Sequence, residues 1–166
     1  MSFVARVMDF HALFDAQYAP VYRYLAHRLG DPAAAEDLAA ETFLRAYAAR
    51  ASFRPGSPRA WLFTIATNLL RDHARGAGRR DAALAAWAGR EPAVAEPEFE
   101  FPDPRLALAL AALRAEEREV LLLYAWAELS YEEIAIATAV ALGTVRSRLH
   151  RARRHVRAHL DQPETP

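Results

Sequence analysis

The chain has 166 residues, enough for one medium domain or two small ones, and 53% of them are hydrophobic, with alanine prominent. The absence of cysteine excludes disulfides, thiolate metal sites and a cysteine nucleophile, and no apolar run reaches the roughly 18 residues that a membrane span needs. The formal net charge is zero, but all 21 basic residues are arginine, and 13 of them lie in residues 50–80 or after residue 143. An acidic stretch separates the two groups, which suggests two contacts with nucleic acid. With no signal-peptide pattern, we expect a cytoplasmic protein that does not insert into a membrane.

The first predicted helix covers residues 10–29, where large apolar residues recur at helical spacing, and Pro20 is expected to bend or split it. Three later helix starts are each marked by a polar residue before a proline, because the polar side chain caps the helix and proline suits its first turn. These pairs are Asp31-Pro32, Ser57-Pro58 and Asp103-Pro104. No strand-like alternation of useful length is present. The fold class is therefore predicted to be all-α.

The helix that begins at residue 32 carries two carboxylates four residues apart, Asp37 and Glu41, which should share its outer face while Leu38 packs inward. Such a pair could belong to a metal site or act in acid–base chemistry, but no further ligands accompany it. An acidic and apolar face suits docking on a basic partner helix better. A merely solvated face is the remaining alternative.

The helix that begins at residue 58 combines a packing face with a polar stripe. Trp61 belongs to the packing face, and the stripe at i, i+4, i+7 and i+11 consists of Thr64, Asn68, Arg71 and Arg75. Amide and guanidinium groups can hydrogen-bond base edges and phosphates. The preceding loop places Phe53 beside basic residues, where an aromatic ring can stack on an unpaired base. The alternative is that Phe53 and Trp61 are core residues.

Helical periodicity fades between residues 81 and 103, where prolines alternate with acidic and small residues. We interpret this segment as an extended acidic linker between a first helical domain, residues 1–80, and a second, residues 104–161. Fully extended, the linker could reach on the order of 70 Å, so the two domains need not touch.

The second domain ends in a predicted helix-turn-helix. Ser130 and Glu133 form a capping box, so a helix should begin at Tyr131, and Gly143 should break the pattern before a second helix over residues 144–159. One stripe of that second helix should be buried: Val145, Leu149, Ala152 and Val156. Another face carries no carboxylate and presents Arg146, Ser147, His150, Arg151 and Arg154. A helix of this kind fits the major groove of DNA, although a solvated basic helix is the simpler alternative.

These segments together resemble the extracytoplasmic-function, or group IV, sigma factors of bacterial RNA polymerase. The resemblance covers nearly the whole chain in order and rests on the segments FHALFDAQYAPVYRYLAHRLGD, AEDLAAETFLRAY, FRPGSPRAWLFTIATNLLRDHAR and LSYEEIAIATAVALGTVRSRLHRAR. It implies a sigma-2 domain, a linker and a sigma-4 domain in a transcription initiation factor that is not an enzyme and needs no cofactor. Ala40, Ala115 and Ala141 depart from residues that are common in the family.

The resemblance also implies roles for individual residues. Asp37, Leu38 and Glu41 would contact core RNA polymerase. The minus-ten promoter element, where a base is flipped out during melting, would be bound by Phe53, Trp61, Asn68, Arg71 and Arg75. The minus-thirty-five element would be bound by Arg146, Ser147, His150, Arg151 and Arg154. Promoter DNA, core polymerase and an anti-sigma factor are therefore the expected partners.

Two other functions compete with this interpretation. A free-standing helix-turn-helix regulator would bind duplex DNA without polymerase, but it would leave the acidic Asp37 helix and the Phe53 loop without a role. An enzyme or metal protein could use His155 and His159, which lie four residues apart, but no third ligand or phosphate-binding loop accompanies them.

Overall fold

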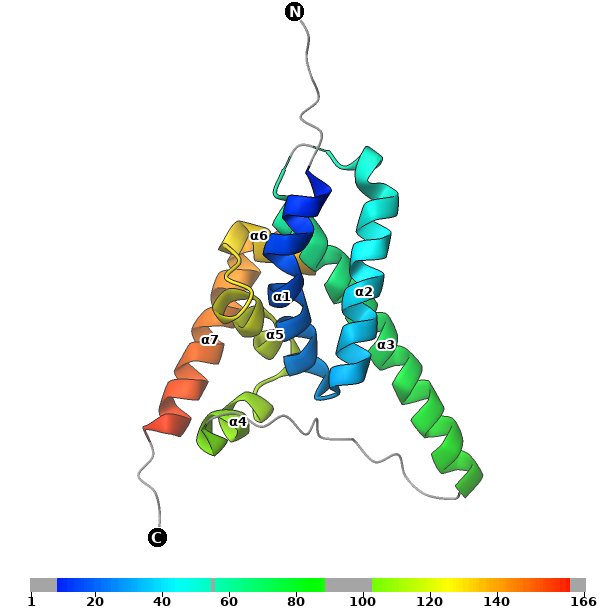
Figure 1. Ribbon diagram of the computed structural model, residues 1–166. Helices are drawn as coiled ribbons and strands as arrows, with labels where there is room; N and C mark the ends of the chain where they lie inside the picture. The colour runs from blue at the N-terminus through cyan, green and yellow to red at the C-terminus, as the bar shows by residue number, and fades with distance from the viewer. Residues whose placement is uncertain (1–8, 55, 89–102, 162–166) are drawn as a thin grey trace, which may run out of the picture.

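The computed structural model describes residues 9–54, 56–88 and 103–161, and these residues form helices joined by short connections (Figure 1). The first group of helices consists of α1 (Phe10–Leu29), α2 (Pro32–Ala49), the short 3-10 helix η1 (Arg50–Ser52) and α3 (Pro58–Ala88). The second group consists of α4 (Pro104–Ala111), α5 (Ala115–Ala125), α6 (Tyr131–Thr138) and α7 (Leu142–Leu160). The predicted all-α class is confirmed.

Helix starts follow the predicted caps. The Asp31 carboxylate accepts hydrogen bonds from the backbone N–H groups of Ala33 and Ala34 at 3.0 and 3.2 Å, and the Ser57 hydroxyl accepts one from Ala60 at 3.1 Å. These side chains satisfy donors that have no partner within the helix. Pro20 lies inside α1 without splitting it, although a proline there removes one backbone hydrogen bond. Val21, Tyr24 and Leu25, which follow it, are buried in the core, and their packing supports the continuous helix.

The turn of the helix-turn-helix lies earlier than predicted. Helix α6 has the expected capping box between Ser130 and Glu133. It ends at Thr138 and is followed by Ala139, whose φ of 55° is left-handed. Helix α7 then begins at Leu142, so Gly143 lies in its first turn and does not break the helix. The turn was predicted at Gly143, but the chain reverses at Ala139, an alanine in a backbone conformation that usually favours glycine.

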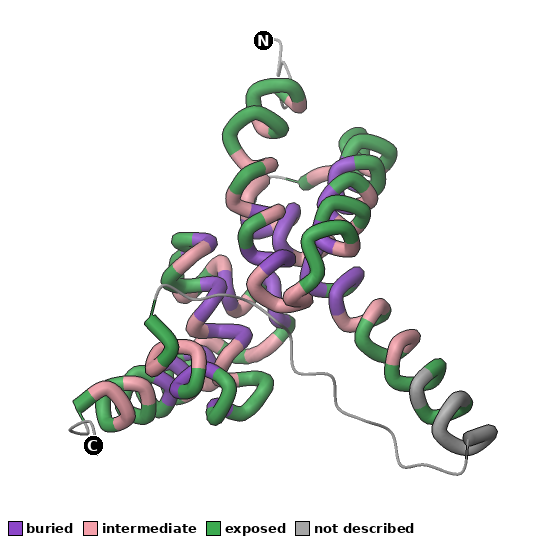
Figure 2. Tube along the Cα trace, turned by 60° about the horizontal axis from the view of Figure 1, so that its bottom comes forward, coloured by how far each residue is buried: buried purple, intermediate pink, exposed green. Residues whose placement is uncertain are grey.

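One continuous core joins the two groups of helices. Buried residues of α1, α2 and α3 belong to the same hydrophobic cluster as buried residues of α5, α6 and α7, and α3 packs against α6. Figure 2 shows these buried segments facing one another, while the far end of α3 extends away from them. The length of the linker did not determine whether the two domains would touch. The structure shows that they pack against each other in a closed arrangement.

Helix α3 continues eight residues into the segment that was predicted to be linker, ending at Ala88. Alanine dominates residues 82–88, and its high helix propensity favours continuation of the helix. Residues 89–102 of the predicted linker lie outside the described residues, and its last residue, Asp103, caps α4. The domain boundaries themselves remain a prediction. Among the described residues, no helix combines the length and the apolar character needed to cross a membrane.

Candidate nucleic-acid interfaces

Helix α7 separates its buried and polar faces as predicted. Val145, Leu149 and Ala152 are buried and Val156 is half-buried, which anchors the helix on the rest of the domain. The predicted DNA-binding residues are all exposed: Arg146, Ser147, His150, Arg151 and Arg154. Because the apolar stripe packs against the rest of the domain, the polar face points to solvent and could enter a DNA groove.

A carboxylate from another helix lies close to this face, which itself carries none, as predicted. Arg151 donates from Nε to Oε1 of Glu117 on α5 at 2.8 Å, and the Glu117 side chain is only 12% exposed. A cavity of about 390 Å³ is lined by these two residues together with Arg114, Arg154 and His155. The Glu117 carboxylate therefore orients the Arg151 guanidinium, a contact from outside the helix that spacing along α7 could not predict.

The polar stripe of α3 is present, but its members have different surroundings. Asn68 is exposed, whereas Arg71 donates to both carboxylate oxygens of Glu119 on α5, at 3.1 and 3.0 Å. Arg75 pairs with Asp72 one turn earlier on its own helix. Only part of the predicted minus-ten face is therefore available while the two domains are closed.

The two aromatic residues of the predicted minus-ten site contact each other. The rings of Phe53 and Trp61 lie 5.0 Å apart between centroids, and both residues are half-buried. Trp61 also packs against the main core, as the core interpretation predicted, and its role in DNA binding remains a prediction. Phe53 follows η1 and contacts the core only through Trp61, among the contacts that the structure describes.

The acidic face of α2 has the predicted arrangement. Asp37 is exposed, and Leu38 is half-buried against the core. Glu41 accepts a hydrogen bond from Nε of Arg45 at 2.6 Å, although its side chain is still 41% exposed. The same helix exposes Leu44 at 65%, so the acidic face borders an apolar side chain.

Two polar contacts between the domains involve the start of α3. The Ser57 hydroxyl donates to Oε1 of Glu133 at 2.5 Å, and the Arg59 guanidinium donates to the carbonyl oxygen of Ala127. Burial opposes ionisation of Glu133, but hydrogen bonds from Ser57 and Ser130 and the nearby Arg59 charge outweigh it, so the pKa of Glu133 lies below its usual value. Sequence reasoning missed these contacts because the partners lie about 70 residues apart.

A histidine also lies at the contact between the domains. The ring of His27 at the end of α1 lies against that of Trp126, with a centroid separation of 3.4 Å. Burial, with a smaller contribution from the Arg23 charge, lowers the pKa of His27 to about 4, so the ring is neutral at physiological pH. His155 and His159 stack at 6.4 Å on α7. No cluster of three or more metal-ligating side chains occurs among the described residues.

Comparison with known protein families assigns each half of the chain. Residues 13–80 match the family described as Sigma-70 region 2, and residues 104–156 match Sigma-70, region 4. The chain is 37% identical over 163 residues to the ECF RNA polymerase sigma factor SigL of Mycobacterium tuberculosis, covering 91% of this chain and 88% of SigL. The chain belongs to the ECF sigma factors. It is thus a transcription initiation factor and not an enzyme, as the sequence predicted.

Two further comparisons agree with this family. The chain is 44% identical over 147 residues to the ECF RNA polymerase sigma factor SigE of Mycolicibacterium smegmatis, covering 84% of this chain but only 57% of SigE. Its fold is similar to that of the sigma factor RpoE in complex with the anti-sigma factor NepR from Bartonella quintana, with a TM-score of 0.75 and 29% identity. That match covers 94% of this chain and all of the solved one, so it includes both groups of helices.

Proposed function

We propose that this ECF sigma factor docks on core RNA polymerase through α2 and directs it to promoters by contacting two DNA elements, one with each domain. The observation that carries the proposal is helix α7, which is anchored by a buried stripe and presents a row of exposed arginine, serine and histidine side chains. That row would enter the major groove of the minus-thirty-five element through Arg146, Ser147, His150, Arg151 and Arg154. Arginine in this geometry can hydrogen-bond a guanine edge, and the hydroxyl suits several bases.

Helix α3 would bind and help to melt the minus-ten element. The exposed amide of Asn68 is placed to hydrogen-bond a base edge, and the Phe53 and Trp61 rings offer a surface on which a flipped base can stack. Arg71 and Arg75 would hold phosphates of the same strand. Because Arg71 is paired with Glu119 in the closed arrangement, the second domain has to move away before this face is complete.

Core polymerase would be bound by the acidic face of α2. Asp37 and Glu41 project from the outer side of the helix, and Leu38 sets the helix against the core. Carboxylates at such a surface attract a basic partner and exclude an acidic one, which gives specificity more than raw affinity. The exposed Leu44 adds apolar area to the same contact.

An anti-sigma factor is the third proposed partner. The solved sigma factor whose fold matches both groups of helices was determined as a complex with an anti-sigma factor. A closed arrangement in which Arg71 is paired with Glu119 is what an inhibitor of promoter binding would stabilise, since ligands shift equilibria toward the state they bind better. The proposed location is the cytoplasm, where polymerase and promoter DNA are found.

Run-off transcription with purified core RNA polymerase tests the proposed function. A template carrying the region upstream of the gene itself should give a defined transcript only when this protein is added. A gel shift separates the alternative of a free-standing regulator, because a sigma factor should bind its promoter tightly only together with core polymerase. Tight duplex binding by the protein alone, without polymerase-dependent transcription, would contradict the proposal.

A further inference from the structure

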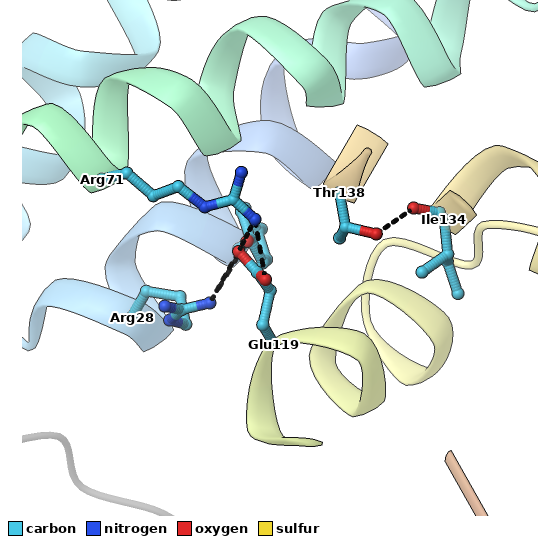
Figure 3. Close-up of polar contacts among 6 residues, drawn as sticks. Arg28, Arg71, Glu119, Ile134 and Thr138 are labelled. Carbon is cyan, nitrogen blue, oxygen red and sulfur yellow. Dashed lines mark hydrogen bonds and ion pairs between the residues drawn. The ribbon is translucent and has the colours of Figure 1, made fainter. Parts of the chain in front are cut away.

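Two arginines of the first domain converge on one carboxylate of the second. The Glu119 side chain on α5 is only 7% exposed, and both of its oxygens accept hydrogen bonds from Arg71 of α3 (Figure 3). Nη1 of Arg28, at the end of α1, approaches Oε1 of the same carboxylate at 3.7 Å. A side chain of the sigma-4 region therefore lies between two guanidinium groups of the sigma-2 region.

Arg28 is held in place by its own helix, and Arg71 reaches the same carboxylate from α3. The Arg28 side chain is only 18% exposed, and its Nη1 donates to the hydroxyl of Tyr24, a fully buried residue of the same helix, at 3.4 Å. Arg71 projects from the middle of α3 toward the same point (Figure 3). Neither arginine pairs with any other carboxylate in the part of the chain that the structure describes. Two guanidiniums that share one anion make a site suited to carboxylate or phosphate oxygens.

We propose that Arg28 and Arg71 form a single anion site that Glu119 occupies when the domains are closed and that a backbone phosphate of the minus-ten DNA occupies when they separate. This inference rests on the proposed role of α3 at the minus-ten element and adds Arg28, which sequence reasoning did not select. Glu119 is then an intramolecular competitor of DNA. Because one anion displaces the other, closure of the domains and phosphate binding at this site exclude each other.

The surroundings of the ion pairs allow such an exchange. A cavity of about 340 Å³ is lined by Arg28, Arg71 and Glu119, together with Arg148 of α7, so an incoming anion can reach the site from solvent. The hydrogen bonds from Ser57 to Glu133 and from Arg59 to Ala127 lie elsewhere on the contact between the domains. Neutralising Glu119 therefore weakens closure without removing every contact that supports it.

Fluorescence anisotropy with a labelled 20-nucleotide oligothymidylate tests the site, because phosphate contacts do not depend on sequence. Glu119→Gln should bind the probe about threefold to tenfold more tightly than wild type, since apparent affinity scales with the population of the binding-competent state. Adding Arg28→Ala to that variant should reverse the gain and lower the slope of log affinity against log salt by about 0.7, the contribution of one single-strand phosphate. The matched control is Arg23→Ala, which removes an exposed arginine from the same helix and should leave the slope unchanged.

Separation of the domains is measured on the same proteins by energy transfer. The chain has no cysteine, so Ala48→Cys on α2 and Asp161→Cys after α7 give unique attachment points for dyes. Adding the probe should lower energy transfer in wild type, and Glu119→Gln should start from a lower value. Circular dichroism confirms folding, and Glu119→Met serves if the glutamine variant does not fold.

Equal probe affinity of wild type and Glu119→Gln would overturn the competition, and an unchanged salt slope after Arg28→Ala would overturn the shared site. Neither measurement uses polymerase. A failure of run-off transcription would instead remove the proposed function, so the two failures can be told apart.

Discussion

Replacing Asn68 by alanine should separate promoter melting from every other property of the protein. The Asn68 side chain is exposed in the middle of α3 and makes no hydrogen bond to the residues that the structure describes. The fold therefore loses nothing, and the higher helix propensity of alanine should raise stability by up to about 0.7 kcal/mol. Any loss of activity then comes from the missing amide and not from unfolding.

The expected loss follows from the hydrogen bonds that an amide makes to a base edge. A bidentate contact is worth about 1–3 kcal/mol, which corresponds to a decrease of about fivefold to 150-fold in open-complex formation. Permanganate reactivity of unpaired thymines on linear promoter DNA measures this quantity with holoenzyme. Co-purification of core polymerase should be unchanged, because the acidic face of α2 lies elsewhere.

A template with a pre-melted, mismatched bubble provides the control for Asn68→Ala. The cost of unpairing the flipped base, a few kcal/mol, is already met on that template, so much of the activity should return. If the variant opens duplex promoter as well as wild type does, Asn68 has no role in melting. If the bubble template does not restore activity, the defect lies in a step other than strand opening.

Four further outcomes are expected. Asp37→Arg should weaken core polymerase binding by a few kcal/mol because like charges would oppose each other, and retention at wild-type strength in a pull-down would contradict this. Arg151→Ala should weaken promoter binding by about 1–3 kcal/mol if the arginine contacts a base, as measured by holoenzyme affinity for upstream promoter variants at several salt concentrations. Glu117→Gln, which removes the carboxylate partner of Arg151, should weaken promoter binding less. Ala139→Gly should stabilise the protein by about 1 kcal/mol in urea unfolding, because glycine tolerates a left-handed backbone, and a lower midpoint would refute it. The pKa of His27 in the folded state is lowered to about 4, so as the pH falls below 6.5 the unfolded chain binds a proton at His27 before the folded chain does. The free energy of unfolding should therefore fall between pH 6.5 and 4. Thermal melts across this range should show a much smaller fall for His27→Gln.

The sequence predicted local structure well because its signals are local. The starts of α2, α3 and α4 followed from polar-proline pairs, and the start of α6 followed from a capping box. The buried stripe of α7 followed from helical spacing in the same way. Each of these features depends on residues within about four positions of one another, so the pattern is visible in the sequence itself.

Features that depend on distant partners were not predictable in the same way. Asn68 and Arg71 lie on one stripe, yet the first is exposed and the second is paired with Glu119, 48 residues further along. The carboxylate beside Arg151 comes from α5, and the turn before α7 uses Ala139 where glycine was expected. Pair contacts between separate helices depend on how those helices pack, and side-chain spacing within one helix does not contain that information.

The residues of the shared core affect both the stability of the fold and the pairing of Arg71 with Glu119. Val120 and Ile134 of the sigma-4 region belong to one cluster with Leu62 of the sigma-2 region, so packing that strengthens this cluster also favours the arrangement in which Arg71 is occupied. Selection for resistance to heat would then tend to silence the factor, and selection for ready promoter opening would tend to make it fragile. Such a trade-off between stability and activity is familiar in proteins whose working state must leave a packed one. Here it predicts that hyperactive variants will map to the interior between the domains as well as to the surfaces that touch DNA.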